Sequence, residues 1–191
     1  MINIKKEIKV KKSVIIGIIA IIVTVILIIA GVNLIGKNNK TTDGMPLISQ
    51  KNNEVTYIDF SYEGISFKLP KEWNVKENAD VLERKFENEN TYFSVMSQDV
   101  PSFAFRDFSE EYMPDMINNL PYTTYESCSS KEYSTYDAYD YNAKTIIKGQ
   151  STPVRATAIS VNDKVIVFLL VTGDNNFNYE EIYDNILLSI K

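Results

Sequence analysis

The side chains with the clearest capacity for chemistry are carboxylates, gathered at two places in the second half of the chain. The first group surrounds an expected helix start: Asp107, Glu110, Glu111 and Asp115. The second group, Asp137 and Asp140, lies on an expected strand rich in Tyr. Oxygen ligands of this kind hold Ca²⁺, but neither group has the Asp-x-Asp-x-Asp-Gly spacing of a calcium loop. We therefore expect a solvated acidic surface and no bound metal or cofactor.

Catalysis is restricted further by the residues that the chain lacks. There is no His and only one Cys, Cys128. This excludes Ser-His-Asp and Cys-His catalysis, His-ligated zinc and an intrachain disulfide. Paired carboxylates could still hydrolyse a glycan, provided that they face each other across a sugar-binding cleft. We expect no catalytic residue, and keep a carboxylate-dependent cell-wall glycan hydrolase as the alternative.

Tyrosine gives the most unusual local composition. Tyr133, Tyr139 and Tyr141 have odd numbers in two expected strands, residues 124–133 and 136–147, so we expect them to line one face. An exposed face would be a candidate surface for contact with a protein or a glycan, because Tyr offers a large area at a low entropy cost. A covered face would be core, which is where aromatic strand residues usually pack.

The elements that must position these residues follow from periodicity and turn signals. We expect one hairpin from residues 55–60 and 65–69, and a second from residues 81–86 and 92–96. A helix at residues 108–119, with a Ser109 cap and a kink at Pro114, follows. Further strands are expected at residues 124–133, 136–147, 154–161 and 164–172, and a last helix at residues 178–190.

Three features indicate how these elements pack. Residues 164–172 (KVIVFLLVT) are apolar on both faces, so this strand should be central and covered on both sides. Ala156, Ala158 and Ser160 share one face of the preceding strand, which leaves room for a helix. Trp73, the only Trp, is expected in the core because of its large area.

An apolar run begins at Ser13 and ends at Ile35. Its length of roughly 34 Å as a helix would cross a hydrocarbon core of about 30 Å. We therefore divide the chain into a basic tail (1–12), a transmembrane anchor (13–36), a polar stalk (37–53) and an outer domain (54–191). This division predicts that residues 13–36 contact the lipid bilayer.

The charges beside this run predict its orientation. Residues 1–12 contain five Lys and one Glu, so the remainder is more acidic than the total of −5. The flank of a transmembrane helix that is richer in Lys and Arg usually stays in the cytoplasm. This places the N-terminus inside the cell and the outer domain outside the cell membrane. A cleaved signal peptide is the competing interpretation, and the apolar length argues against it. An acidic outer domain also excludes nucleic acid as a partner.

Two short phrases carry a resemblance to a known family. They are Phe67 to Trp73 (FKLPKEW) near the domain start and Asn185 to Ile190 (NILLSI) at its end. With the order of the elements, they make residues 55–190 resemble the PsbP-like family. The resemblance implies an α+β fold, an α/β/α-type sandwich with a largely antiparallel sheet, here preceded by one transmembrane helix. It also implies a noncatalytic role in binding or assembling other proteins.

These observations predict a single-pass membrane protein that displays a noncatalytic binding or assembly module in a bacterial cell envelope. We expect its partner to be another envelope protein. An accessory subunit of a secretion or conjugation machine is a further alternative, which differs only in the partner.

Overall fold

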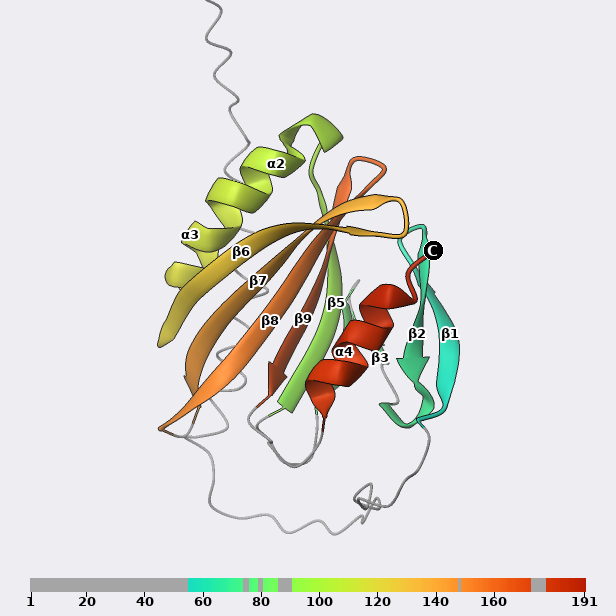
Figure 1. The fold of residues 1–191 in the computed structure, drawn as a ribbon, viewed down its shortest axis with the longest axis horizontal. Coiled ribbons are helices and arrows are strands. Elements are labelled where there is room, and N and C mark those ends of the chain that lie inside the picture. The colour runs from blue at the N-terminus through green and yellow to red at the C-terminus, as the bar shows by residue number, and fades with distance from the viewer. Residues whose placement is uncertain (1–54, 74–75, 79–80, 86–90, 148, 173–177) are drawn as a thin grey trace, which may run out of the picture.

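The apolar segment Lys164–Thr172 forms the central strand, β9, of a seven-stranded antiparallel sheet. The order across the sheet is β3-β4-β5-β9-β8-β7-β6, and β1 and β2 form a separate two-stranded sheet (Figure 1). The computed structural model describes residues 55–73, 76–78, 81–85, 91–147, 149–172 and 178–191. Within these residues the expected α+β fold with antiparallel sheets is confirmed.

The strands and helices have the following bounds. The strands are β1 (Tyr57–Tyr62), β2 (Ile65–Pro70), β3 (Lys76–Asn78), β4 (Val81–Lys85), β5 (Thr91–Asp99), β6 (Thr123–Tyr133), β7 (Tyr136–Ile147), β8 (Gln150–Val161) and β9. The helical elements are η1 (Lys71–Trp73), η2 (Ser102–Ala104), α2 (Phe105–Asp107), η3 (Phe108–Tyr112), α3 (Met113–Asn118) and α4 (Tyr179–Leu188).

Helix α4 covers one face of the sheet, which we call the α4 face. Its buried stripe includes Ile182, Tyr183 and Ile186. They pack with the even-numbered side chains of β9, among them Phe168. Asn178 caps the helix by accepting a hydrogen bond from the backbone N–H of Glu181 (3.2 Å), as its position before an apolar stripe would favour.

The β1–β2 hairpin lies beside α4 and adds large rings to the same core (Figure 1). Phe67 meets Phe168 edge to face, with ring centroids 5.1 Å apart. Trp73 is buried against Phe93 (4.9 Å), so the expected core position of the Trp is confirmed. The last residue, Lys191, exchanges two backbone hydrogen bonds with Ser66, which fixes the chain end to β2.

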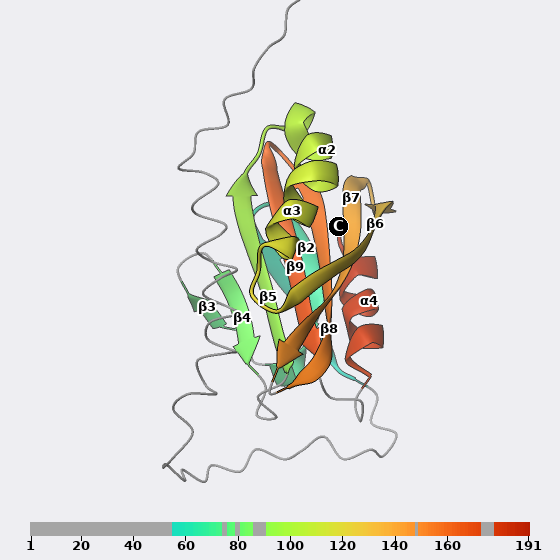
Figure 2. The same cartoon turned by 90° about the vertical axis from the view of Figure 1, so that its left-hand side faces the viewer.

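The opposite face, which we call the α2–α3 face, is covered by the helical segment from η2 to α3 (Figures 1 and 2). Ala156 and Ala158 are buried there together with Phe105 and Phe108, so the expected approach of a helix to these small residues is confirmed. Such small side chains let a helix lie close to the strand, because they occupy little of the space between the two layers.

Two details of this segment differ from the expectation. The helix begins at Phe105, one turn earlier than predicted, and Ser109 is a buried residue of a π-helical turn, not a cap. Burial of Phe105 and Phe108 on the sheet draws the helix start back along the chain. The π-turn ends at Tyr112, two residues before Pro114 in the first turn of α3. A widened turn suits a residue that has no N–H to donate.

The expected tail, anchor and stalk lie outside the described residues. No helix of the part that the structure describes has the length and apolar character needed to span a bilayer.

Candidate functional site

The β6–β7 hairpin places the three tyrosines on two faces, so the expectation of one shared face is wrong. Tyr133 pairs with Tyr136 across a two-residue loop, Ser134 and Thr135. An odd-numbered residue of β6 therefore lies beside an even-numbered residue of β7, and shares its face. Tyr133 packs with the core of the α4 face, whereas Tyr139 and Tyr141 belong to the α2–α3 face.

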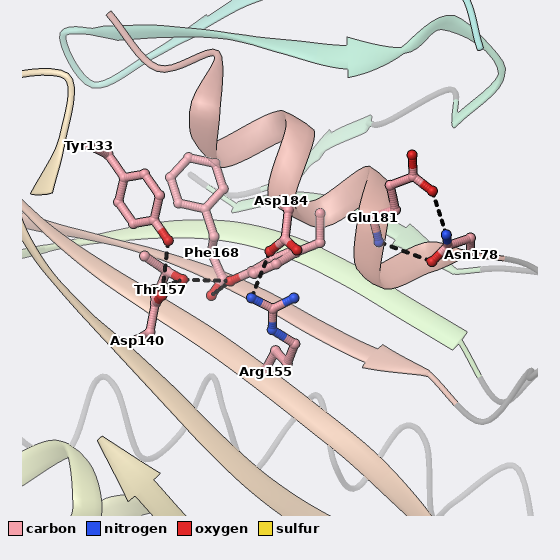
Figure 3. A network of polar contacts seen from close by, with 9 residues as sticks. Tyr133, Asp140, Arg155, Thr157, Phe168, Asn178, Glu181 and Asp184 are labelled. Carbon is pink, nitrogen blue, oxygen red and sulfur yellow. Dashed lines mark hydrogen bonds and ion pairs between the residues drawn. The ribbon is translucent and has the colours of Figure 1, made fainter. Parts of the chain in front are cut away.

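On the α4 face, Tyr133 takes part in a hydrogen-bonded network around Asp140 (Figure 3). The Tyr133 hydroxyl donates to one carboxylate oxygen of Asp140 (2.9 Å), and the Thr157 hydroxyl donates to the other (2.7 Å). Burial, followed by the negative charge of Asp140, raises the pKa of Tyr133 well above its ordinary value. Tyr133 is thus a half-buried donor that satisfies a carboxylate.

The network continues to α4 through Tyr183. Its hydroxyl lies 3.1 Å from both the Thr157 hydroxyl oxygen and the Phe168 carbonyl oxygen. Arg155 lies over the Tyr183 ring, 4.9 Å from its centroid, and donates to Asp184 (2.8 Å; Figure 3). Burial is the largest single influence and lowers the pKa of Arg155, but the hydrogen bond to Asp184 and the negative charges of Asp184 and Asp140 together outweigh it, so the pKa is raised. These contacts hold α4 on the sheet.

On the α2–α3 face, Tyr141 is covered, with only 1% of its surface exposed. Its hydroxyl donates to the carbonyl oxygen of Ser109 in the π-turn (3.1 Å). Burial raises the pKa of Tyr141 far above its ordinary value. Tyr141 is therefore a core residue that fastens the π-turn to β7, and it offers no contact area to a partner.

Tyr139 lies at the rim of this face and is only half-buried. Its ring meets Phe105 edge to face (5.6 Å), and its hydroxyl donates to Glu110 (2.9 Å). The other oxygen of Glu110 accepts a hydrogen bond from Arg106 (3.0 Å), and this contact is the main reason why the pKa of Glu110 is lowered. Of the three tyrosines, Tyr139 has the position best suited to an outer contact.

The two carboxylate groups are not brought together as a metal centre. Among the described residues, no three Cys, Asp or Glu side chains are close enough to hold a metal ion. Glu110 lies over the α2–α3 face, whereas Asp140 is bonded within the α4 face. Cys128 is half-buried on β6, and burial raises its thiol pKa, which disfavours the reactive thiolate.

One carboxylate pair was not considered from the sequence. Glu132 and Asp137 are directly opposite each other in the β6–β7 register, and both are exposed. They lie next to the hairpin loop and are open to solvent. The hairpin register could have revealed this pair, since the two-residue loop fixes which residues face each other.

Comparisons with known proteins add a likeness of fold. No protein-family description and no curated protein sequence matches the chain. Among solved structures, the solution structure of cyanobacterial PsbP (CyanoP) from Synechocystis sp. PCC 6803 is similar, with 13% identity, a TM-score of 0.52, and coverage of 73% of this chain and 94% of that one. The crystal structure of LpqN, involved in cell envelope biogenesis of Mycobacterium tuberculosis, has 13% identity, a TM-score of 0.49, and coverage of 73% and 92%.

The layers and the strand order define a class first: an antiparallel sheet between a helical segment on one face and a helix with a hairpin on the other. The similarity to cyanobacterial PsbP then identifies the fold within this class, since the match covers nearly all of that protein. The described domain has a PsbP-like fold, as the two sequence phrases implied.

Proposed function

We propose that this chain is a membrane-anchored, extracytoplasmic binding or assembly module of a bacterial cell envelope, with no catalysis of its own. The observation that carries the noncatalytic part is the use of the carboxylates. Glu110 is engaged by Arg106 and Tyr139, and Asp140 by Tyr133 and Thr157. Both of these carboxylates have a structural role, and they lie on opposite faces of the sheet.

The alternative of a glycan hydrolase is disfavoured by the same geometry. Such an enzyme needs two carboxyls about 5–9.5 Å apart on either side of a bound sugar. The Glu132 and Asp137 pair meets the requirement of closeness, but it stands exposed at the end of a hairpin. A double variant, Glu132→Gln with Asp137→Asn, tests this directly in a cell-wall glycan assay.

The membrane part of the proposal depends on the apolar run from Ser13 to Ile35 and on the lysines before it. Tethering raises the effective concentration of a module near other membrane proteins, so a modest affinity suffices for binding. The partner would then be another envelope protein, either a free-standing one or part of a secretion or conjugation machine.

Chemical cross-linking of the full chain in its native membrane tests the binding function. We expect defined adducts with one or a few envelope proteins, which disappear when the domain is removed and the anchor is kept. Glycan turnover by the purified domain that the double variant abolishes would overturn the proposal in favour of the hydrolase.

Protease added to intact protoplasts tests the topology separately. We expect loss of the outer domain and protection of the N-terminal tail. An outer domain that survives intact while an exported control is digested would show the orientation to be wrong.

A further inference from the structure

Three phenylalanines lie close together in the sequence between β5 and the start of the π-turn, and they differ in how far they are exposed to solvent. Phe105 and Phe108 are 5% and 8% exposed, and both are buried against the sheet. Phe103 is 78% exposed. A Phe ring in water forgoes the free energy that burial would provide, so burial of Phe103 by a partner would be favourable.

The backbone that carries Phe103 is held firmly by the β8–β9 turn. Asp163, in a left-handed conformation (φ 60°), accepts hydrogen bonds from the N–H (2.8 Å) and the hydroxyl (2.9 Å) of Ser102. Its own carbonyl accepts from the N–H of Val100 (3.0 Å). The N–H of Ser102 also lowers the pKa of Asp163. Because the turn is fixed before any contact, little ordering entropy would be lost when Phe103 meets a partner.

The short helical segment that carries Phe103 also carries the residues that contact Tyr139 at the rim, Phe105 and Glu110. Arg106 lies three residues after Phe103 in the same helical segment, which places it on the same side. Arg106 bonds to Glu110, and Glu110 accepts from Tyr139. We call these four residues, Phe103, Arg106, Glu110 and Tyr139, the distal surface. Aromatic residues and Arg are the types enriched in the centres of protein interfaces.

The charge around the distal surface is negative. Asp99, Asp107 and Glu111 are exposed in the same stretch of the chain. Two cations lie near them: Arg106, which bonds to Glu110, and Lys164, which is opposite Asp99 in the β5–β9 register and pairs with Glu63. A complementary partner would therefore surround its apolar contact with positive side chains, because opposite potentials speed encounter and fix the register of docking.

The η2 turn lies at one end of the sheet, and β1 begins at the other end (Figure 1). The negative side chains in the stretch around Phe103 oppose contact with an anionic lipid surface, so such a surface is a poor candidate for covering Phe103.

Two other large apolar residues of the described part are as exposed as Phe103 and provide controls. Leu188 (76% exposed) lies in the last turn of α4, beside the polar residues Asp184 and Asn185. Tyr122 (75% exposed) directly precedes β6. Neither residue has the combination of a clamped turn, an adjacent Arg and a second aromatic ring.

We propose that the distal surface, with Phe103 as its anchor, binds a partner protein that offers an apolar pocket bordered by Lys or Arg side chains. This inference rests on the proposed binding function and specifies where the contact is made and with what chemistry.

Site-specific photocrosslinking in the native membrane locates the contact. The full chain carries a photoreactive phenylalanine analogue in place of Phe103, Leu188 or Tyr122, one position at a time. We expect adducts only from position 103. The partner peptide recovered from them should combine apolar residues with neighbouring Lys or Arg.

Affinity for the protein identified in this way then tests the anchor. We expect Phe103→Ser to weaken binding at least about tenfold, which is the effect of losing an interface anchor. Leu188→Ser, matched in exposure, should change affinity by less than about twofold. Both variants should keep the melting temperature of the parent, since neither side chain is buried.

The outcomes separate the inference from the proposed function. Adducts from position 188 or 122 and none from position 103 overturn the distal surface and leave the binding function intact. Adducts of position 103 with lipid or with a second copy of the chain overturn the stated partner. Absence of any protein adduct, both here and in bulk cross-linking, overturns the binding function as well.

Discussion

The two faces of the central sheet are both covered, but they are built differently. The α4 face is filled by large rings that are almost completely buried, among them Phe67, Trp73, Phe93 and Phe168. The α2–α3 face presents small sheet residues, Ala143, Ala156 and Ala158, to a short irregular helical segment.

Their polar contacts differ in the same way. On the α4 face, Asp140 is satisfied by Thr157 and Tyr133 between the layers. On the α2–α3 face, the charged contact of Arg106 with Glu110 is exposed to solvent. The α4 face therefore has its carboxylate bonded between the layers, while the rim of the α2–α3 face keeps its charged contact in solvent.

The largest test of this comparison removes one ring from each face. Phe168→Ala should lower the free energy of unfolding by about 3–5 kcal/mol, because it leaves a cavity in the central strand that neighbours cannot fill. Phe105→Ala should cost clearly less, because its neighbours lie nearer to solvent and can close over the gap. Urea unfolding of both variants measures this, and equal losses would contradict the division between the faces.

A subtler test removes one buried hydroxyl from each face. Tyr183→Phe should cost about 1–3 kcal/mol, since the Thr157 hydroxyl and the Phe168 carbonyl both lose a neighbour. Tyr141→Phe should cost about 0.5–1.5 kcal/mol, because it loses one bond to a carbonyl oxygen. A larger loss for Tyr141 would mean that the π-turn contributes more to stability than α4.

The same two residues predict a dependence on alkaline pH. Burial raises the pKa of both hydroxyls in the folded state. A raised pKa favours the protonated form, so this stabilisation is complete below the unfolded value of about 10 and is lost as pH rises through the folded pKa. Both hydroxyls should stay protonated up to about pH 11 as long as the protein is folded. The parent, Tyr183→Phe and Tyr141→Phe should therefore show the same tyrosinate absorbance over that range.

On the exposed side of the hairpin end, the effect should be small and of opposite sign. Glu132 and Asp137 place like charges directly opposite each other. Glu132→Lys should raise the free energy of unfolding by about 0.2–1 kcal/mol at low salt. Glu132→Gln, which only removes the repulsion, should give a smaller gain, and a loss in both variants would show that the pair has another role.

The smallest effect concerns the exposed rim. Arg106→Gln should raise the pKa of Glu110, because the guanidinium is the main cause of its lowered value. The lowered pKa means that this contact stabilises the fold above the unfolded pKa and ceases to do so as pH falls through the folded value. NMR titration of the Glu110 carboxyl in the parent and in the variant checks this, and an unchanged pKa of Glu110 would contradict the assigned cause.

Much of the fold could be predicted from local patterns. Residues 164–172 were predicted as a central strand covered on both faces, and β9 has these bounds and this position. The hairpins, the last helix and the core position of Trp73 followed from turn residues, periodicity and size. These features depend on neighbours in sequence, which a single chain displays directly.

The features that the sequence did not predict depend on how distant parts of the chain are placed against each other. Odd residue numbers in both strands predict that Tyr133 and Tyr139 share a face. Across the two-residue loop, however, odd-numbered residues of β6 pair with even-numbered residues of β7, so the two side chains lie on opposite faces. The Asp140 to Thr157 bond depends on the register of β7 against β8, which residue type alone does not fix. The outward position of Phe103 depends on the clamp by Asp163, 61 positions away from Ser102 in sequence.

The order of strands also determines how the chain would reach this fold. Strands β6 to β9 form a meander in which each strand pairs with the next through a short turn. These contacts are local, so forming them costs little loop-closure entropy. The pairing of β5 with β9 and the bond from Lys68 to Ser189, 121 residues apart, close long loops. We expect the meander to form early. The later pairing of β5 with β9 and the docking of β2 beside the end of α4 should limit the folding rate.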